Sequence, residues 1–521
     1  MLKKQIIGES NCVEERKNIK YGVIISYVSL AVSIILHIFF TPFLLDRVGQ
    51  IQYGLLAFVT SITSWFTIGA YALNDSFIKF STVEFSKRGD NKRSNAIYIK
   101  LLIILGLGIS LIGAILYILL KANIIPLNNY SENEKNEILL LYCISLMQVI
   151  FTTVFAFFRL FNEYKSNFIF IKTVALASTF TTTFVNIVYL QRHSSVVFIA
   201  IVGAIAAVVT LLLYYAAAKI KYNIVFGNDT LKDNVSYVKE IITYSSYLLL
   251  SVIVTEINTS VDKTILGFFS GASYVTVYQL GLAFDTYYSE FVISVNSVFI
   301  PRINMLVVEN KHESVKDFFL DLSGIQSIIV FLIIGGFYIS GKEFIAAWLG
   351  ENQPTVYVIS LVLMILHSVH YCSYSSQIVQ RAYSKHKIPA CINLAVALIN
   401  VIVSVILVSA FPIEYSVWMC LIGTVFAEVL GRWIIIPIYN YKALGLPMVR
   451  FYFQMLRIAI ICVISCLTAN YCFHFIFRNI GMAVWKVFFF KSFTFLIIYL
   501  LLVIPSNFYL IKKIYDIWRK K

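Results

Sequence analysis

The chain has 521 residues, of which 59 % are hydrophobic and 13 % are charged. Soluble proteins carry about 25 % charged residues, so this composition excludes a soluble enzyme and indicates an integral membrane protein. The net charge of +15 would suit a nucleic-acid-binding protein, but the basic residues form short clusters between apolar segments, as topology signals do, and no nucleic-acid partner is expected.

Fourteen apolar segments are long enough to cross the roughly 30 Å hydrocarbon core of a bilayer. They are 21–45, 54–78, 96–120, 138–158, 168–190, 196–218, 242–268, 274–300, 319–340, 356–380, 388–410, 414–438, 452–474 and 486–510. With the N-terminus inside, most of the 42 Lys and Arg residues fall in inside segments, so both termini are predicted to be cytoplasmic. The polar start precedes a run too long for a signal peptide.

A single offset of 222 residues relates Gly49 to Gly271, Arg159 to Arg381 and Lys165 to Lys387. Such an internal offset is typical of duplicated transporter halves. The fold class predicted is therefore an all-α membrane protein of fourteen transmembrane helices, with two six-helix lobes around a central cavity and two extra C-terminal helices. The predicted parts are a cytoplasmic tail (1–20), the first lobe (21–218), a cytoplasmic linker (219–241), the second lobe (242–438), the extra helices (452–510) and a basic cytoplasmic tail (511–521).

A charged stretch interrupts the seventh apolar segment and reads D-K-T-I-L-G-F-F-S-G from Asp262. With Val275 and Tyr278 it resembles the seventh-helix signature of the polysaccharide (oligosaccharide) flippases, although Thr276 replaces the usual Gly. Segments 42–54 (P-F-L-L-D-R-V-G-Q-I-Q-Y-G), 69–80 (G-A-Y-A-L-N-D-S-F-I-K-F) and 298–303 (V-F-I-P-R-I) resemble further motifs of that family, in the expected order. The superfamily also contains multidrug and toxin extruders and lipid II flippases.

The resemblance implies a flippase of the bacterial inner (cytoplasmic) membrane, not an enzyme. Its substrate would be a polyprenyl-diphosphate-linked oligosaccharide repeat unit, moved by alternating access to the outer leaflet for cell-surface polysaccharide assembly. Besides the lipid bilayer, a polysaccharide polymerase and chain-length machinery are the partners that this pathway suggests. Two alternatives share the fold: a lipid II flippase and a multidrug cation antiporter. A membrane scaffold for polysaccharide enzymes is the non-transport alternative.

The candidate site residues are polar groups at membrane depth, where charges are costly and are commonly functional. An anionic headgroup would need a cationic cavity, for which the candidates are Lys172, Lys263, Arg159 and Arg432. Coupling to H⁺ or Na⁺ would use a carboxylate, and the candidates are Glu256, Asp262 and Asp285; Asn74, Asp75 and Asn258 are further cavity candidates. For Arg159 and Arg432 the alternative to substrate binding is a position at the membrane interface, where basic residues mark topology. Arg432 is also spaced to neutralise Glu428 on its own helix.

Neither a catalytic constellation nor a cofactor motif is recognised in the sequence. His367 and His370 stand at i and i+3, but without a carboxylate or Cys partner for the pair no metal site is expected. The eight cysteines fall almost entirely in apolar segments and are expected to serve as small apolar side chains.

Overall fold

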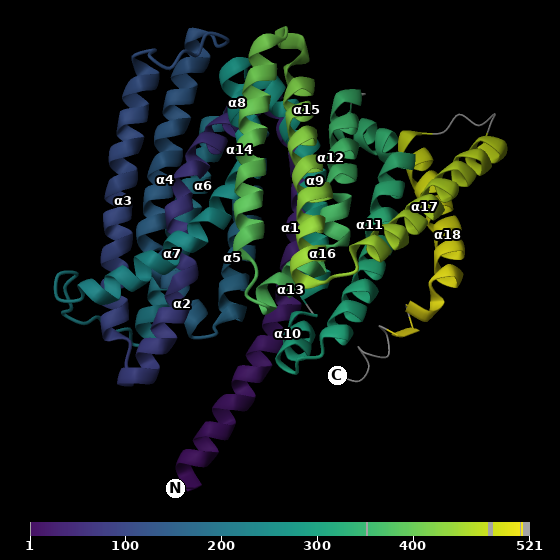
Figure 1. The fold of residues 1–521 in the computed structure, drawn as a ribbon. Helices are drawn as coiled ribbons and strands as arrows, with labels where there is room; N and C mark the ends of the chain where they lie inside the picture. Colours follow the sequence, from purple (N-terminus) through teal and green to yellow (C-terminus); the bar gives the residue numbers. More distant parts are fainter. Residues whose placement is uncertain (1, 298, 351–352, 478–482, 511, 514–521) are drawn as a thin grey trace. The chain divides into compact units, whose positions relative to one another are not determined.

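The computed structural model describes residues 2–297, 299–350, 353–477, 483–510 and 512–513, and these are almost entirely helical (Figure 1). No strand occurs within these ranges. Val298, the first residue of the 298–303 motif, and most of the predicted basic tail 511–521 lie outside them.

The chain divides into two compact units, Met1–Thr276 and Val277–Lys521, and the division falls within one helix. The helices of the first unit are α1 (Leu2–Ser64), α2 (Ile68–Arg88), α3 (Lys92–Lys121), α4 (Glu132–Tyr164), α5 (Phe168–Leu190), α6 (Val196–Ile220), α7 (Val235–Glu256) and α8 (Asp262–Phe269), with short turns η1 (Trp65–Thr67) and η2 (Ile257–Val261). α9 (Ala272–Ser297) contains the division.

The second unit continues with α10 (Ile300–Val308), α11 (His312–Leu349), α12 (Pro354–Cys372), α13 (Tyr374–Ala382), α14 (Lys387–Ala410), η3 (Ile413–Tyr415), α15 (Ser416–Glu428), η4 (Val429–Ile435), α16 (Ile436–Leu444), α17 (Met448–Phe477) and α18 (Val484–Ser506).

Twelve helical segments of the described residues are long and apolar enough to cross a membrane, which confirms a multi-pass, all-α membrane protein. The predicted spans 21–45 and 54–78 fall largely within one segment, Ala31–Arg88, because the chain stays helical on both sides of Gly49. The predicted span 274–300 falls mainly on α9, which is not among the twelve. The count of fourteen therefore remains a prediction.

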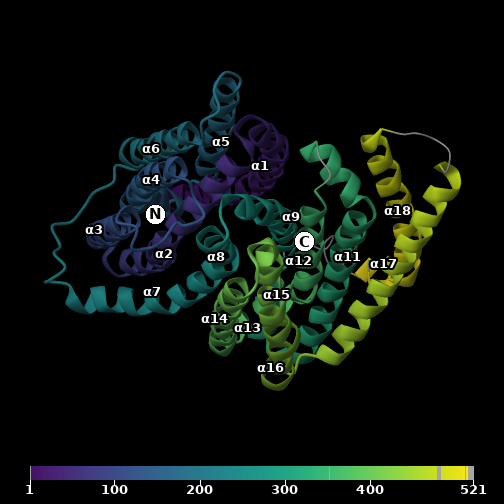
Figure 2. The same cartoon turned by 90° about the horizontal axis from the view of Figure 1, so that it is seen from above.

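In the first unit, α4 packs against α3 and α6, and α7 runs along α2 (Figure 2). The core beneath them is rich in aromatic side chains, among them Phe77, Tyr98 and Phe157, all fully buried. The Ser245 hydroxyl of α7 donates to the Ser76 hydroxyl of α2 at 3.1 Å. These contacts explain why α7 belongs to the first unit, although the irregular connection of residues 221–234 precedes it.

Two glycines of the first unit, one within α1 and one directly before α9, have left-handed backbone conformations. Gly49 has φ +82 and Gly271, at the offset of 222, has φ +104; both values lie in the left-handed region that favours glycine. A Cβ atom on Gly54 would lie 2.0 Å from the carbonyl oxygen of Ala272, so α1 and α9 approach closely there. Thr276, the departure from the family signature, donates its hydroxyl to the Gln50 carbonyl at 2.6 Å and so ties the same two helices.

In the second unit, the long helix α11 packs against α12, α17 and α18. A core of buried side chains that includes Val292, Phe319 and Phe451 joins α9, α11 and α17. The C-terminal pair is anchored by polar contacts as well: Lys491 pairs with Glu343 at 2.5 Å, and the Tyr499 hydroxyl donates to the Ile328 carbonyl at 2.8 Å. The helices predicted to lie outside the repeat are thus bound to α11.

Candidate functional site

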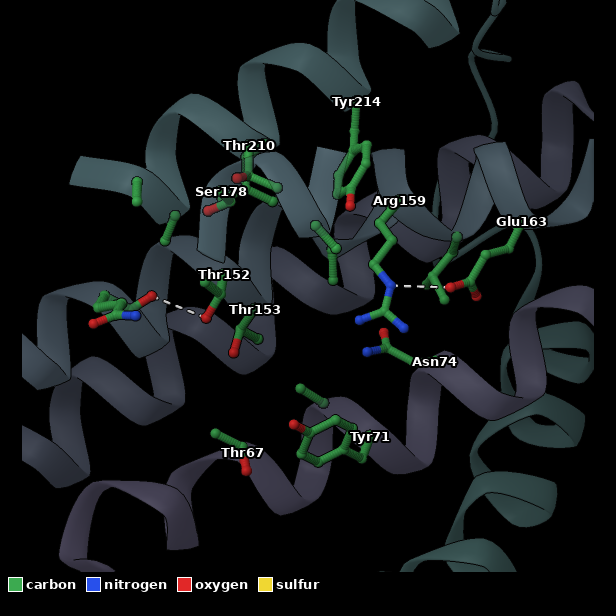
Figure 3. A pocket seen from close by; sticks show the side chains of 18 of the residues that line it. Thr67, Tyr71, Asn74, Thr152, Thr153, Arg159, Glu163, Ser178, Thr210 and Tyr214 are labelled. Carbon is green, nitrogen blue, oxygen red and sulfur yellow. Dashed lines mark hydrogen bonds and ion pairs between the residues drawn. The ribbon is translucent and has the colours of Figure 1, made fainter. Parts of the chain in front are cut away.

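A polar cavity of about 610 Å³ lies within the first unit, among α2, α4, α5 and α6 (Figure 3). Ligand pockets of proteins commonly have volumes of 300–1,000 Å³. Its polar lining residues are Thr67, Tyr71, Asn74, Asp75, Gln148, Thr152, Thr153, Arg159, Glu163, Ser178, Thr182, Thr210 and Tyr214. Apolar helices that gather this many hydroxyl and amide groups around one space provide a site for a polar ligand at membrane depth.

The hydroxyl groups of the cavity are arranged as acceptors. Thr152 donates to the Gln148 carbonyl at 2.9 Å, Thr182 to the Ser178 carbonyl at 2.9 Å, and Thr67 to the Ser64 carbonyl at 2.7 Å. A hydroxyl has one proton and two lone pairs, so each of these oxygens keeps accepting capacity after its proton is engaged. The lining therefore suits a ligand that brings many O–H or N–H donors.

Arg159 is the basic residue that lines the cavity, and it is held by Glu163. Its Nε atom lies 2.9 Å from Glu163 Oε1, one helical turn further along α4. Asn74 of α2 faces the guanidinium in Figure 3, and its Oδ1 atom is buried without a hydrogen-bond partner. With Glu163 and Asp75 also in the lining, the cavity is polar but not cationic.

A second polar locus follows α7, at the signature stretch. Glu256 ends α7, the π-helical turn η2 follows, and Asp262 begins α8. The Glu256 Oε1 atom is buried without a hydrogen-bond partner. Lys263 is close enough to Glu256 and Asp262 to interact with both through their charges. π-helical turns inside α-helices occur frequently at functional sites.

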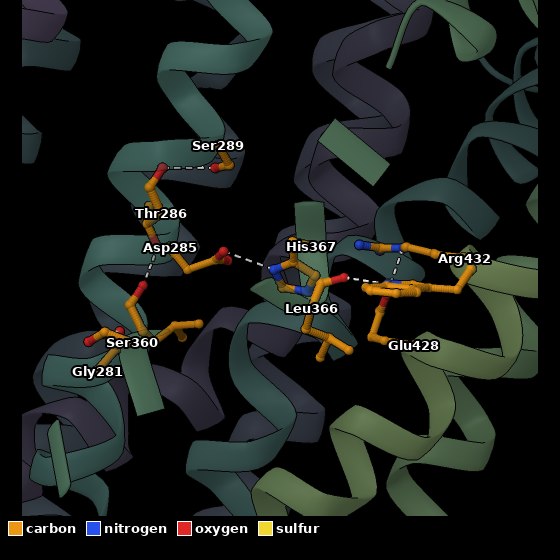
Figure 4. Close-up of polar contacts among 11 residues, drawn as sticks. Gly281, Asp285, Thr286, Ser289, Ser360, Leu366, His367, Glu428 and Arg432 are labelled. Carbon is orange, nitrogen blue, oxygen red and sulfur yellow. Dashed lines mark hydrogen bonds and ion pairs between the residues drawn. The ribbon is translucent and has the colours of Figure 1, made fainter. Parts of the chain in front are cut away.

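A third locus lies in the second unit, where α12 stands between α9 and the segment α15–η4 (Figure 4). His367 Nδ1 of α12 lies 2.9 Å from Asp285 Oδ1 of α9. Arg432 Nε, in the π-helical segment η4, lies 3.0 Å from Glu428 Oε2. The Trp433 indole donates to the Leu366 carbonyl at 2.7 Å. All four ionisable side chains are at most 13 % exposed, so this is a buried charge network.

The predicted site residues are thus distributed over three places. Arg159, Asn74 and Asp75 line the cavity. Glu256, Asn258, Asp262 and Lys263 lie together around η2, whereas Lys172 is partly exposed on α5 and does not line the cavity. Asp285 and Arg432 belong to the network of the second unit, where Arg432 pairs with Glu428 as its spacing suggested.

Sequence reasoning missed the hydroxyl lining and the pairing of His367 with Asp285. The hydroxyl residues had a signal, because Gln148 and Thr152 stand one turn apart in an otherwise apolar span. His367 had none, since its carboxylate partner is 82 positions away in the chain. Among the described residues, no group of three or more His, Cys, Asp or Glu side chains could hold a metal ion.

The sequence profile of the family described as polysaccharide biosynthesis protein matches residues 19–307, more than half of the chain. A comparison with curated proteins finds no match. Among solved structures, the lipid II flippase MurJ in its inward closed conformation superposes with a TM-score of 0.72 at 15 % identity; the match covers 94 % of this chain and 100 % of that one.

Transporters of the multidrug group are similar over a smaller part. An inward-facing multidrug resistance MATE family transporter of the MOP superfamily has a TM-score of 0.55 at 12 % identity, with 81 % of this chain and 98 % of that chain covered. A mutant of the MATE transporter VcmN of Vibrio cholerae has 0.52 at 14 %, with 83 % and 99 % covered. At these identities the likeness is one of fold. By its sequence the chain belongs to the polysaccharide biosynthesis protein family, and it has the fold of the MOP superfamily transporters.

Proposed function

We propose that this protein is a flippase that translocates a polyprenyl-diphosphate-linked oligosaccharide repeat unit from the inner to the outer leaflet of the bacterial inner membrane. The proposal places both termini in the cytoplasm and the substrate in the pathway of a cell-surface polysaccharide such as an O-antigen, a capsule or an exopolysaccharide. A polysaccharide polymerase and chain-length machinery are the proposed downstream partners.

The cavity of the first unit is the observation that carries this proposal. A sugar presents several O–H donors, and the oxygens of Thr67, Thr152 and Thr182 have lone pairs left to accept them. A hydrogen bond contributes about 1 kcal/mol net, so several must act together to hold a sugar. Arg159 adds a charged donor for a phosphate or an acidic sugar. The lipid tail stays in the bilayer.

We assign ion coupling to the buried network around Asp285 and His367. Two carboxylates and one guanidinium leave one negative charge, which a proton on His367 neutralises, so the network is neutral with one cation bound and carries one buried negative charge after its release. The other ionisable groups around it are Tyr288 on α9 and His370 and Tyr371 on α12. Because an imidazole is a proton carrier, this arrangement favours H⁺ over Na⁺. Glu256 and Asp262 remain predictions for the same role.

The second candidate function is a lipid II flippase, favoured by the superposition with MurJ over 94 % of this chain. Both functions move a polyprenyl diphosphate, and they differ in the headgroup. Expression of this protein in cells depleted of their own lipid II flippase separates them, because survival would support the second function. The multidrug antiporter alternative predicts sensitivity to cationic dyes on deletion.

The direct test is a leaflet-resolved analysis of lipid-linked sugars in native cells depleted of this protein. The expected result is an intact oligosaccharide on a polyprenyl diphosphate that accumulates in the inner leaflet, and mass spectrometry would give its composition. Accumulation of lipid II would replace the proposal with the second candidate. Unchanged lipid-linked sugars would reject both.

A further inference from the structure

A second hollow of the first unit lies between α2 and α7, where the cavity lining of α2 ends. Its volume is about 780 Å³. On α2, cavity-lining residues end at Ile78 and the residues that line this groove begin at Lys79. Tyr71 and Asp75 line the cavity, and Lys79 and Lys87 line the groove; at about 100° per residue, Lys87 is turned by about 160° around the helix axis from Tyr71. The groove therefore lies further along α2 than the cavity and on another side of the helix, the side that packs against α7.

The groove carries an excess of positive charge. Two of its five basic side chains, Arg88 and Arg93, share the buried carboxylate of Glu84, at 3.0 and 3.7 Å. The other three are Lys79, Lys87 and Lys239. None of these three forms an ion pair with a carboxylate of the described residues. Two carboxylates, Glu84 and Glu240, also line the groove, so its five basic side chains exceed its acidic ones by three, and a site of this kind is complementary to a polyanion.

The groove is also a structured site, because aromatic rings hold two of its cations. The Lys79 ammonium lies 3.6 Å from the centre of the Tyr244 ring, and the Arg93 guanidinium lies 4.3 Å from the centre of the Tyr237 ring. Such cation–π contacts orient a charged group without neutralising it. In addition, the Arg93 Nε atom is buried and has no hydrogen-bond partner. An anion that accepts from the basic side chains would complete these contacts.

The surroundings of the groove favour an anion that is attached to a lipid. Large apolar side chains next to the lysines are exposed, among them Ile78, Val83 and Ile242. A free phosphate compound has no apolar part that could pack against this rim, whereas a lipid has one. A phosphodiester headgroup carries one negative charge, whereas the diphosphate of a polyprenyl diphosphate carries about two and matches three unpaired lysines better.

From these observations we infer that the α2–α7 groove binds the diphosphate headgroup of a polyprenyl-linked lipid, at a site separate from the cavity. The inference rests on the proposed function for the identity of the lipid, and it adds a headgroup-binding site formed by Lys79, Lys87 and Lys239. Arg93 and the two tyrosines position the site.

The experiment measures binding of farnesyl diphosphate to the purified full-length protein in phosphatidylcholine nanodiscs. The test variant is Lys79→Gln/Lys87→Gln/Lys239→Gln. The control variant, Lys219→Gln/Lys221→Gln/Lys232→Gln, removes the same charge from the neighbouring segment outside the groove. The expected result is at least a tenfold weaker Kd for the test variant and less than a twofold change for the control. Equal affinity of wild type and test variant would overturn the inference.

Two further arms identify the ligand. Inorganic pyrophosphate is expected to compete with farnesyl diphosphate, since the headgroup is what the lysines recognise. Nanodiscs that contain phosphatidylglycerol are expected to leave the affinity within twofold; if phosphatidylglycerol competes as well as pyrophosphate does, the groove is a general anionic-lipid surface and the inference fails.

The headgroup-binding site and the proposed function can fail separately. Lysine-dependent binding in the absence of trapped lipid-linked sugars in depleted cells would retain the groove and reject the flippase function. Trapped sugars, together with full transport and unchanged binding by the test variant, would retain the flippase and reject the groove.

Discussion

His367 Nδ1 lies 2.9 Å from Asp285 Oδ1, and the two side chains are 13 % and 8 % exposed. They come from α12 and α9, so the pair joins two helices of the second unit. A buried ion pair contributes little net stability compared with apolar side chains of the same size, because both groups lose their hydration. Its presence among apolar helices is the reason for the coupling role that we propose for it.

We expect Asp285→Asn to reduce transport at least tenfold and to make the residual transport insensitive to the proton gradient, because the remaining imidazole loses its charged partner. The measurement is transfer of a lipid-linked sugar between the two leaflets of proteoliposomes with and without an imposed pH gradient. Glu309→Gln is the matched control, since Glu309 pairs with Lys311 at 2.8 Å on an exposed surface.

A purely structural role predicts a different outcome for the double variant. Breaking a buried pair costs about 3–5 kcal/mol, and replacing both partners by neutral groups removes most of that cost. If Asp285→Asn/His367→Gln regains stability and full gradient-driven transport, the coupling role is wrong. Regained stability without coupling would agree with it.

Thr152→Val tests the hydroxyl lining of the cavity. The substitution keeps the shape and removes one acceptor, so we expect the affinity for the lipid-linked sugar to fall about fivefold, the equivalent of about 1 kcal/mol. Thr468→Val is the control: Thr468 on α17 also donates to its own helix, to the Ile464 carbonyl at 2.8 Å, but it lies outside the cavity. Equal affinity of both variants in a binding titration would exclude a sugar contact at Thr152.

Arg159→Gln tests the charged donor. An unpaired Glu163 would then remain in the cavity, so we expect a loss of more than tenfold in transport of a substrate with an acidic headgroup. Arg159→Gln/Glu163→Gln removes the pair and separates the two causes: if Arg159 binds substrate, the double variant stays defective. Recovery of transport in the double variant would mean that Arg159 only neutralises Glu163.

Gly54→Ala tests the close approach of α1 and α9. The new Cβ atom would lie 2.0 Å from a backbone oxygen, which cannot rotate away, so we expect a loss of about 1–3 kcal/mol in stability and a lower Tm. Gly108→Ala, also inside an apolar helix, meets nothing within 4 Å and is expected to leave Tm unchanged or slightly raised. A thermal-shift measurement on the two purified variants decides the matter.

The fold class followed from the sequence because a bilayer imposes one requirement on every span: about 20 apolar residues in a helix that satisfies its own backbone. This requirement is local, so the predicted span 168–190 coincides with α5 and 388–410 lies within one residue of α14. The predicted spans 21–45 and 54–78 leave a gap that contains Gly49, and Gly49 is where α1 has a non-helical backbone. Its positive φ is a conformation that favours glycine.

The grouping of polar residues was decided by the tertiary structure alone. The sequence indicated Arg159, Asp75 and Asp285 as costly groups in an apolar setting, but hydrophobic periodicity carries no information on which helix faces which. Asp285 meets His367 across 82 positions, and the threonines of α4 and α5 meet only because both helices line one cavity. Contacts of this kind depend on helix rotation and packing, which are set by the whole core and not by any one segment.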